Sequence, residues 1–488
     1  MKKSMKIYKL VLLAFLFASI TTSCSDDADD IGPKPTVPGE QRSLVVENFI
    51  YRGMNEIYLY KAFVPVLADN YFSSQAERNN FLDNYDSPED LFDNGVTAPQ
   101  DKFSFLVDDY VALENLFSGV SKTSGLSYGL VRYCASCSDI FAFVRLVLPN
   151  TSADEVGVER GMIFNRVDGQ QLTDSNYQTL LAPDTFTIGL AKLEGTTISN
   201  LEETFTLTKR EYTKNPVFVA KVIETEEKRV GYLYYDSFTG DFDKELNDAF
   251  GLFKAASVTD LVLDLRYNGG GSVRTATDLA AMITGQFAGE IFMKEVWNTK
   301  YQNYFEQQDA ESLLNRFNTT IKTGEAINSL NLGTVYVLTT ERSASASELV
   351  INGLEPYINV IQIGETTTGK FQASVTLYDS PNFGRSGANT THTYAIQPLV
   401  LKSVNSAGVS DYINGLSPDY AISEDYRNLG QLGDPNEPFL KLALDVILGN
   451  KISIPERIEE FKPFGESGMD HLDYQKMYID KVPDLINK

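Results

Sequence analysis

Two residues whose side chains could share one reaction, Ser345 and Lys370, stand at the ends of neighbouring apolar runs. Ser345 lies in TTERSASASELVINGLEP, residues 339–356, where a strand-type run ends in small polar residues and a helix-type pattern begins. Lys370 lies in GETTTGKFQ, residues 364–372, after the next apolar run. Strand ends of this kind hold catalytic groups in α/β enzymes, and one helix and one strand, folded back, can bring the two turns together.

A serine beside a lysine suggests nucleophilic catalysis with the amine as general base. The ordinary pKa of a lysine is about 10.4, so burial among apolar groups must lower the pKa of Lys370 before it can accept a proton near neutrality. A shift of about three units costs roughly 4 kcal/mol, which the surrounding fold has to supply. A purely structural role is also open, because Ser345 and Glu348 fit the S-x-x-E pattern of a capped helix.

The region that must position these residues, about 214–450, alternates strand-type with helix-type patterns and predicts an α/β layer structure. We expect strands at 231–238, 261–265, 334–340 and 359–364, and a helix at 243–256. A further helix is marked by apolar residues on one face, namely Ala276, Leu279, Ala280 and Ile283.

Two regions precede this core and one follows it. Helical spacing of the apolar residues predicts a small helical domain at 43–117. From 118 to 213, short β-type runs such as 141–148 and 186–193 predict a β domain. The tail, 451–488, is polar and irregular in pattern, and we assign no chemistry to it.

Five stretches resemble, in order and spacing, the motifs of the C-terminal-processing (tail-specific) serine peptidases. They are DKFSFLVDD (101–109), LVLDLRYNGGG (261–271), SASASE (343–348), the Gly-Lys turn (369–370) and YINGLSPDY (412–420). The resemblance covers about residues 45–450. It implies an α/β catalytic core of crotonase/ClpP-like β-α layers, with a PDZ-like β domain inserted before it and an N-terminal helical domain.

By this resemblance Ser345 is the nucleophile and Lys370 the base, and Ser343 and Ser347 are the chief rivals of Ser345. The tetrahedral intermediate needs N–H donors aimed at its oxygen. We expect this oxyanion hole at the helix start and at a glycine turn that allows close backbone approach, that is, at Ala346, Gly270 and Gly271. Glycines after a buried strand can equally serve a tight turn alone.

The sequence departs from the family at the residue that orients the lysine. The family often has a Gln four residues after the lysine, whereas here that position is Ser374 and the nearest glutamine is Gln372. Either of the two could support Lys370. A Ser-His-Asp triad would have to use His392 or His471, the only histidines, and His392 lies on an expected strand where packing is the commoner role.

Residues 152–170, SADEVGVERGMIFNRVDGQ, are similar to the helix, turn and strand of PDZ domains. A PDZ domain binds a peptide C-terminus as an added strand and holds its carboxylate with N–H groups of a glycine-containing loop. The candidate loop is GLSYGL, residues 125–130, with Gly129 and Leu130 as peptide contacts. Such a glycine-bearing stretch is often only a turn.

The first residues predict an exported, lipid-anchored protein. Lysines precede an apolar run, 10–20, and small residues then lead to Cys24, so that 1–23 reads as a lipoprotein signal peptide and 24–42 as an acylated cysteine with a linker. Eleven apolar residues are too few to cross a hydrocarbon layer of about 30 Å. The cysteine fits a lipidation site, although Thr21 replaces the usual leucine. The acidic run SDDADD resembles the surface-export signals of Bacteroidetes lipoproteins, and fits a solvated linker as well.

Composition excludes several other classes of function. The 488 residues carry a formal net charge of −24, which repels nucleic acid. Cys134 and Cys137, as CASC, can form a strained disulfide in an oxidising compartment. A zinc site would need two more ligands, and none stands at a matching spacing. No metal and no soluble cofactor is implied, and the oligomeric state is left open.

These observations favour an endopeptidase of the cell envelope. The type of signal predicts that it lies at the outer membrane and meets the membrane only through its lipid anchor. The predicted substrate is an unstructured protein C-terminus, anchored at the PDZ-like domain and cut upstream. Two alternatives remain at this point. One is a catalytically silent peptide-binding lipoprotein, and the other is a structural partner in an envelope complex.

Overall fold

The computed structural model describes residues 42–452, 454, 461–472 and 474–483. The predicted signal peptide, the lipidation site Cys24 and nearly all of the predicted linker therefore lie outside the described residues. Residues from Leu44 onward form one compact unit. Within the described part of the chain, no helix combines the length and the apolar character that a membrane span requires.

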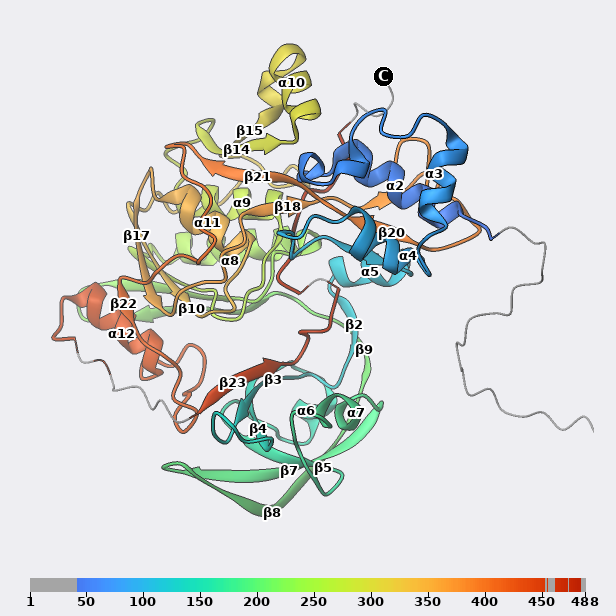
Figure 1. The fold of residues 1–488 in the computed structure, drawn as a ribbon. Coiled ribbons are helices and arrows are strands. Elements are labelled where there is room, and N and C mark those ends of the chain that lie inside the picture. Colours follow the sequence, from blue (N-terminus) through green and yellow to red (C-terminus); the bar gives the residue numbers. More distant parts are fainter. Residues whose placement is uncertain (1–41, 453, 455–460, 473, 484–488) are drawn as a thin grey trace, which may run out of the picture. The chain divides into compact units, whose positions relative to one another are not determined.

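A six-stranded, mainly parallel sheet forms the centre of this unit (Figure 1). Its strands pair in the order β10 (Val217–Glu224), β11 (Arg229–Tyr235), β12 (Asp260–Asp264), β16 (Thr334–Thr339), β17 (Asn359–Gly364) and β22 (Tyr420–Ala421). Only the edge strand β10 is antiparallel to its neighbour. The four strands predicted for this region are present, and the expected α/β architecture of the core is confirmed.

Alternate residues along these strands enter two different cores, because successive side chains point to opposite faces of a sheet. On β12, Leu261 and Leu263 pack with helices α8 (Asp243–Ala255), α9 (Val273–Ile283) and α11 (Ala346–Leu354). Val262 packs on the opposite face with α12 (Pro438–Leu448). A parallel sheet covered by helices on both faces follows from such continuous apolar strands.

A second six-stranded sheet lies across α9 and α11 from the first. Its order is β13 (Gly271–Ser272), β24 (Met477–Tyr478), β18 (Gln372–Ser374), β21 (Leu399–Asn405), β14 (Ile291–Trp297) and β15 (Leu314–Arg316). Helix α11 contacts β17 of the first sheet and also β14 and β21 of the second. The helix that follows Ser345 is therefore enclosed by both sheets.

The N-terminal described segment is helical, as its spacing predicts. It contains α2 (Val45–Ile57), α3 (Gln75–Leu82), α4 (Pro88–Asp90), α5 (Tyr110–Phe117), three short helical turns (61–63, 65–67 and 91–96) and the strand β1 (Phe105–Val107). The apolar face of α2 enters the same hydrophobic core as α8, α9 and α11. Strand β1 pairs with β20 (Ala395–Gln397), which in turn pairs with β19 (Leu377–Tyr378).

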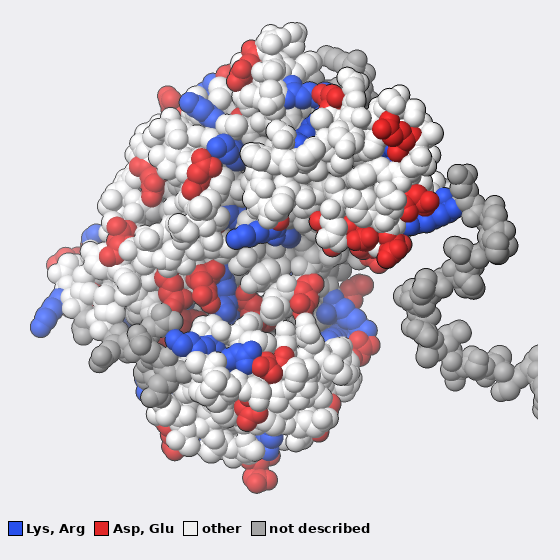
Figure 2. Space-filling view, in the orientation of Figure 1, with Lys and Arg blue, Asp and Glu red and all other residues white. Residues whose placement is uncertain are grey.

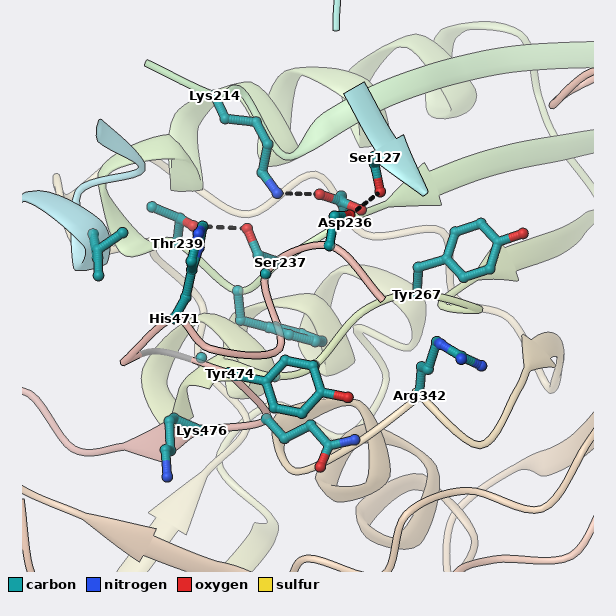
Figure 3. Close-up of a pocket in the computed structure, with 18 of the residues that line it drawn as sticks. Ser127, Lys214, Asp236, Ser237, Thr239, Tyr267, Arg342, His471, Tyr474 and Lys476 are labelled. Carbon is teal, nitrogen blue, oxygen red and sulfur yellow. Dashed lines mark hydrogen bonds and ion pairs between the residues drawn. The ribbon is translucent and has the colours of Figure 1, made fainter. Parts of the chain in front are cut away.

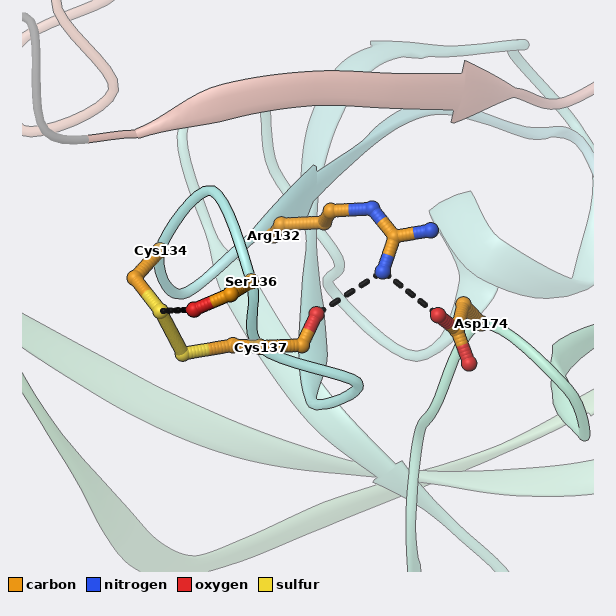
Figure 4. Close-up of a disulfide and its surroundings, with 5 residues drawn as sticks. All are labelled: Arg132, Cys134, Ser136, Cys137 and Asp174. Atoms are coloured by element: carbon orange, nitrogen blue, oxygen red, sulfur yellow. Dashed lines mark hydrogen bonds and ion pairs between the residues drawn. A yellow bond between two sulfur atoms is a disulfide. The ribbon is translucent and has the colours of Figure 1, made fainter.

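A β region with a separate core follows (Figure 1, cyan to green). Its elements are β2 (Val120–Thr123), β3 (Leu126–Arg132), β4 (Ile140–Val147), α6 (Ser152–Glu155), β5 (Ile163–Val167), β6 (Gln170–Gln171), α7 (Tyr177–Leu181), β7 (Thr185–Glu194), β8 (Thr197–Thr208) and β9 (Arg210–Thr213). Between β3 and β4, Cys134 and Cys137 form a disulfide, beside which Arg132 pairs with Asp174 (Figure 4).

The tail corrects the expectation of an irregular segment. Its strand β23 (Lys462–Glu466) joins the edge of β3, and its strand β24 is inserted between β13 and β18. The polar composition of 461–478 concealed these strands, because backbone groups make the pairing and only single residues such as Met477 are buried.

Lys and Arg are scattered among Asp and Glu over the face drawn in Figure 2, without a continuous basic surface. The charge distribution on this face agrees with the acidic composition. It offers no extended site for a phosphate backbone.

A fully buried arginine connects the end of β12 to the start of α12. Arg266 contacts the carboxylates of Asp264 and Glu437 at 2.6 Å each. Glu437 also accepts a hydrogen bond from the Leu440 N–H and so caps α12. Removal of one partner leaves buried charge without compensation, which is costly.

We therefore expect Glu437→Ala to lower the free energy of unfolding by about 3–5 kcal/mol, because Arg266 loses a partner and α12 loses its cap. Urea denaturation would measure this change. The control is Asp445→Ala, which breaks the more exposed pair with Lys441 on the same helix and should cost less than about 1 kcal/mol. Equal effects of the two changes would contradict a special role of the buried pair.

Candidate active site

Ser345 stands at the turn between β16 and α11, next to the carboxyl end of the parallel strand β17. Its backbone has φ of 66°, a conformation that residues with a Cβ rarely adopt and that structures retain mainly at functional sites. The side chain is fully buried, and Oγ has no hydrogen-bond partner among the described residues. Ser345 therefore presents an unpaired hydroxyl on a strained turn.

The rival serines use their hydroxyl groups structurally. Ser343 Oγ donates to the carbonyl of Leu265 at 2.8 Å, and Ser347 Oγ donates to the carbonyl of Asn268 at 3.0 Å. Both bonds tie the turn to the segment after β12. Of the three serines, only Ser345 keeps its hydroxyl unpaired in the described structure.

The carboxylate of Glu348 joins the serine turn to the lysine turn. One oxygen, Oε2, accepts the N–H groups of Ser345 and Lys370 at 2.8 Å each. The other, Oε1, accepts the Gly369 N–H and the Thr367 hydroxyl, at 2.6 Å each. Glu348 thus accepts the Ser345 N–H as the capping pattern predicts. The same carboxylate also holds the turn at 367–370, which lies beyond the next strand.

Lys370 is fully buried, and its Nζ donates to the backbone carbonyl of Gln475 at 3.1 Å. Lys370 Nζ also lies over the ring of Phe103, 5.0 Å from its centroid. Burial in the first place, and the positive charge of Lys476 in the second, hold the pKa of Lys370 well below its usual range. Asp101 and Glu348 act in the opposite direction but do not reverse the shift.

Two of the three residues predicted for the oxyanion hole, Ala346 and Gly270, lie next to the serine. Ala346 is the first residue of α11, so the helix itself does not use its N–H. A Cβ on Gly270 would lie 2.6 Å from Ser345 Cβ and 3.0 Å from the Ala346 nitrogen. Only glycine allows this approach. The Gly270 N–H is already bonded to Asn268 Oδ1, whereas Gly271 belongs to the strand β13 beside β24.

The expected supports of Lys370 require a correction. Gln372 Nε2 bonds to the Tyr60 hydroxyl, and Ser374 Oγ donates to the Met477 carbonyl. Neither residue forms a hydrogen bond with Lys370 Nζ in the described structure. The side chains of Gln372 and Ser374, both on β18, bond to other groups. The hydrogen-bond partner of Lys370 is the backbone carbonyl of Gln475, in the tail.

The predicted peptide-binding loop is also corrected. Gly129 and Leu130 lie within the strand β3, which pairs with β4 on one side and with β23 on the other. A Cβ on Gly129 would lie 2.4 Å from the Phe143 ring. The glycine therefore serves close packing inside a sheet, and neither residue belongs to an open loop.

The two histidines form no hydrogen bond with the three serines in the described part of the chain. His392 Nε2 pairs with Asp379 at 3.1 Å, and Nδ1 accepts the Tyr394 N–H. His392 lies before β20, in a loop and not on the expected strand. His471 lines a cavity of about 180 Å³ next to the glycine turn (Figure 3).

This cavity is bounded by the glycine turn 269–271, by residues 236–239 and by the tail. Figure 3 shows Tyr267 and Arg342 around the same space as the tail residues Tyr474 and Lys476. Ser345 and Lys370 are not among its lining residues. The tail residue Gln475 lines the cavity and also accepts the bond from Lys370.

Sequence reasoning missed Gln475 and the full role of Glu348. Glu348 carried a signal, since it completes S-x-x-E, but its bonds to the turn at 367–370 could not be read from helix capping. Phe103 lies in DKFSFLVDD, one of the stretches that resemble the peptidase family. Gln475 carried no signal, because its backbone carbonyl, and not its side chain, contacts Lys370.

Two models of peptidase family S41 match the chain. The peptidase domain matches residues 229–421 and the N-terminal domain of the same family matches residues 46–105. Together they cover more than half of the sequence, including the turns of Ser345, Lys370 and Gly270.

Known proteins agree with this match. The carboxyl-terminal-processing proteases of Picosynechococcus sp. and Synechocystis sp. are each 23% identical, over 320 and 330 residues, which are 62% and 65% of this chain. The matches span 66% and 68% of those relatives. A solved structure from Bacteroides fragilis NCTC 9343, assigned to the S41 proteases, superimposes with a TM-score of 0.63 at 25% identity, over 85% of this chain and 99% of that one.

The lowered pKa of Lys370 predicts a pH-dependent stability. Between the folded pKa and the ordinary value of about 10.4, the unfolded chain binds a proton that the folded chain does not, so the stability of the wild type rises with pH. Relative to Lys370→Met, the free energy of unfolding should rise by about 1.4 kcal/mol per pH unit within this window. Chemical denaturation from pH 7 to 10 would measure the difference.

The matched control is Lys244→Met, which removes an exposed lysine paired with Asp248. We expect no such rise for this control. A pH-independent difference between the wild type and Lys370→Met would mean that Lys370 stays protonated in the folded chain.

Proposed function

Because the chain belongs to peptidase family S41, we propose that it is a serine endopeptidase with Ser345 as nucleophile and Lys370 as general base. The observation that supports this most strongly is the shared Glu348 oxygen, which holds the N–H groups of both residues. Each nitrogen is 2.8 Å from that oxygen, so the two backbones cannot lie further apart than twice this distance. The unpaired Ser345 hydroxyl and the lowered pKa of Lys370 give the pair the chemistry it needs.

In the proposed reaction, neutral Lys370 takes the proton from Ser345 Oγ as this oxygen bonds to the carbonyl carbon of a peptide. The negative carbonyl oxygen meets the Ala346 N–H and the glycine turn. The C–N bond then breaks, and Lys370 returns the proton to the leaving amine. Water, deprotonated by Lys370, hydrolyses the acyl-enzyme and restores the serine. Lys370 Nζ must leave the Gln475 carbonyl to do this.

The proposed substrate is an unstructured protein C-terminus. The curated relatives of the chain are named carboxyl-terminal-processing proteases, and the β region 118–213 has the short helix, glycine turn and strands that favour a PDZ-like peptide-binding domain. Its open ligand edge would be β3, now paired with β23. Binding by strand addition suits a disordered C-terminal segment, because backbone hydrogen bonds supply affinity for many sequences.

We propose that the protein acts in the cell envelope, attached to the outer membrane. Either the outer or the inner face of this membrane fits the proposal. The proposal rests on the signal-like residues 1–23 and on Cys24 with its acidic linker. We expect Cys24→Ser to move the protein from the membrane to the soluble fraction on cell fractionation. Continued sedimentation of Cys24→Ser with membranes would contradict a lipid anchor at this residue.

A second candidate function is peptide binding without cleavage. Ser345 and Lys370 are both fully buried, and the ammonium is bonded to Gln475 instead of to the serine. A silent binding protein would retain this arrangement permanently. The catalytic proposal is favoured because a binding site has no need for an unpaired hydroxyl on a strained turn beside a lysine of lowered pKa.

Cleavage of an unfolded protein by the chain from Ser25 onward tests the catalytic proposal. Ser345→Ala and Lys370→Ala should each reduce the rate by about a thousandfold or more, because one removes the nucleophile and the other its base. Gel analysis and mass spectrometry of the products would measure the rates and cleavage positions, and circular dichroism would confirm folding.

Ser343→Ala and Ser347→Ala are the matched controls, since each removes a hydroxyl that donates to a backbone carbonyl, and Ser343 Oγ in addition accepts the Thr340 N–H. We expect them to retain activity within about tenfold. Activity that survives Ser345→Ala would place the nucleophile elsewhere. A folded wild type that cleaves no member of a broad panel of C-terminal sequences would favour the binding protein.

A further inference from the structure

The tail segment 461–478, which the structure describes except for residue 473, lies on two strand edges that a peptide could use. Strand β23 pairs antiparallel with β3, at Lys462 opposite Arg132 and Glu466 opposite Gly129. Strand β24 runs parallel to β13 and β18 and fills the space between them. Strand addition at exposed edges is a general mode of peptide binding. The chain's own tail thus occupies both edges.

At the second edge the tail meets the candidate catalytic groups. The Gln475 carbonyl accepts the bond from Lys370 Nζ. The Lys476 carbonyl oxygen and Ser345 Cβ both lie within 2.7 Å of the point that a Cβ of Gly270 would take. A peptide carbonyl therefore already stands beside the serine, and both candidate groups are shielded from solvent.

Between the two edges the tail places a carboxylate against two arginines. Glu466 pairs with Arg145 of β4, and with Arg342 Nε at 2.6 Å. Arg145 is 2% exposed, and its Nε and Nη2 have no hydrogen-bond partner among the described residues. The pair offers more donors than Glu466 uses, and arginines of this kind suit carboxylate recognition.

The path from the β3 edge, past Arg145 and Arg342, to the edge between β13 and β18 is called the peptide track here. We propose that the tail segment 461–478 is a built-in occupant of this track. Arg145 and Arg342 form a carboxylate site, which Glu466 fills until the terminal carboxylate of a substrate replaces it. This inference rests on the proposed peptidase function. It adds the recognition of the C-terminus by two arginines and a self-blocked resting state.

The direction of the tail explains why it blocks the site and is not itself the substrate. From the carboxylate site at Glu466 the tail runs in the N-to-C direction toward the serine. A substrate whose final carboxylate occupies the same site and whose upstream residues reach the serine must run in the opposite direction, from the serine to the arginines, along the second edge alone. Between Glu466 and the serine, the tail therefore runs opposite to such a substrate.

The tail has a strained backbone where it meets the candidate catalytic groups. Gln475 has φ of 51°, a left-handed conformation that residues with a Cβ rarely adopt. Its side chain makes one hydrogen bond, from Nε2 to Thr368 Oγ1. Glycine at this position would relieve the strain, whereas proline cannot adopt a positive φ.

The first experiment uses the chain from Ser25 onward, which keeps every described residue, and follows covalent labelling of Ser345 by a fluorophosphonate probe. Glu466→Gln keeps the shape of the side chain but removes its charge, and Gln475→Pro disrupts the bound conformation. We expect both to raise the labelling rate and the cleavage rate by about tenfold or more. Gln475→Gly should lower both rates by about fivefold, since it stabilises the blocked state.

The matched control is Glu424→Gln, because Glu424 is also a buried carboxylate beside an arginine, Arg160, but is not in the tail. Its labelling rate should stay within about twofold of the wild type. Wild-type rates in Glu466→Gln and Gln475→Pro, or no decrease in Gln475→Gly, would overturn the proposal while leaving the peptidase function intact.

The second experiment separates the inference from catalysis. Hydrogen exchange of residues 461–478 is followed in the Ser345→Ala chain, with an unstructured peptide that ends in a free carboxylate and with its C-terminal amide. We expect faster exchange with the carboxylate peptide and no change with the amide. Equal effects of the two peptides would overturn the arginine site. Faster exchange of the tail with the carboxylate peptide, combined with a wild type that is neither labelled by the probe nor able to cleave, would reject only the peptidase function.

Discussion

The candidate site depends on one buried carboxylate, that of Glu348. It takes four hydrogen bonds, two to each oxygen, from turns that follow two different strands. Burial raises its pKa, and these bonds oppose the shift. Because Glu348 stands in the first turn of α11, the positive end of the helix dipole also favours its charge. The carboxylate thus fixes the relative position of the serine and lysine turns before any substrate arrives.

The central sheet makes this arrangement possible. Strands β16 and β17 are parallel neighbours, so their carboxyl ends, Thr339 and Gly364, lie side by side. Gly364 has φ of 135°, and a Cβ there would lie 2.0 Å from the Thr339 carbonyl oxygen. Only glycine allows the end of β17 to lie this close to the end of β16, where the two turns begin. The helix between them then returns its first turn, with Glu348, to the point where the turns meet.

The fold of the core was predictable from the sequence because its signals are local. Apolar runs gave β12, β16 and β17 to within one residue, and the spacing of Ala276 to Ile283 gave α9. The errors concern pairing over long distances. The Gly129 region has the pattern of a loop, and only β23, more than 300 residues later, completes its sheet. The partner of Lys370 is the backbone carbonyl of Gln475, a group that every residue has, so the residue type gives no signal.

Water exclusion joins the two halves of the site. The pKa of Lys370 is low mainly because the residue is buried, and the tail through Gln475 and Lys476 is part of what buries it. If the tail leaves and water enters, the charged form of the lysine is stabilised again and a smaller fraction of Lys370 is neutral. A peptide that replaces the tail and covers Lys370 as Gln475 does restores the neutral form. Proton transfer would then be faster under a bound peptide than in an open site, which links the activity of the base to occupancy of the track.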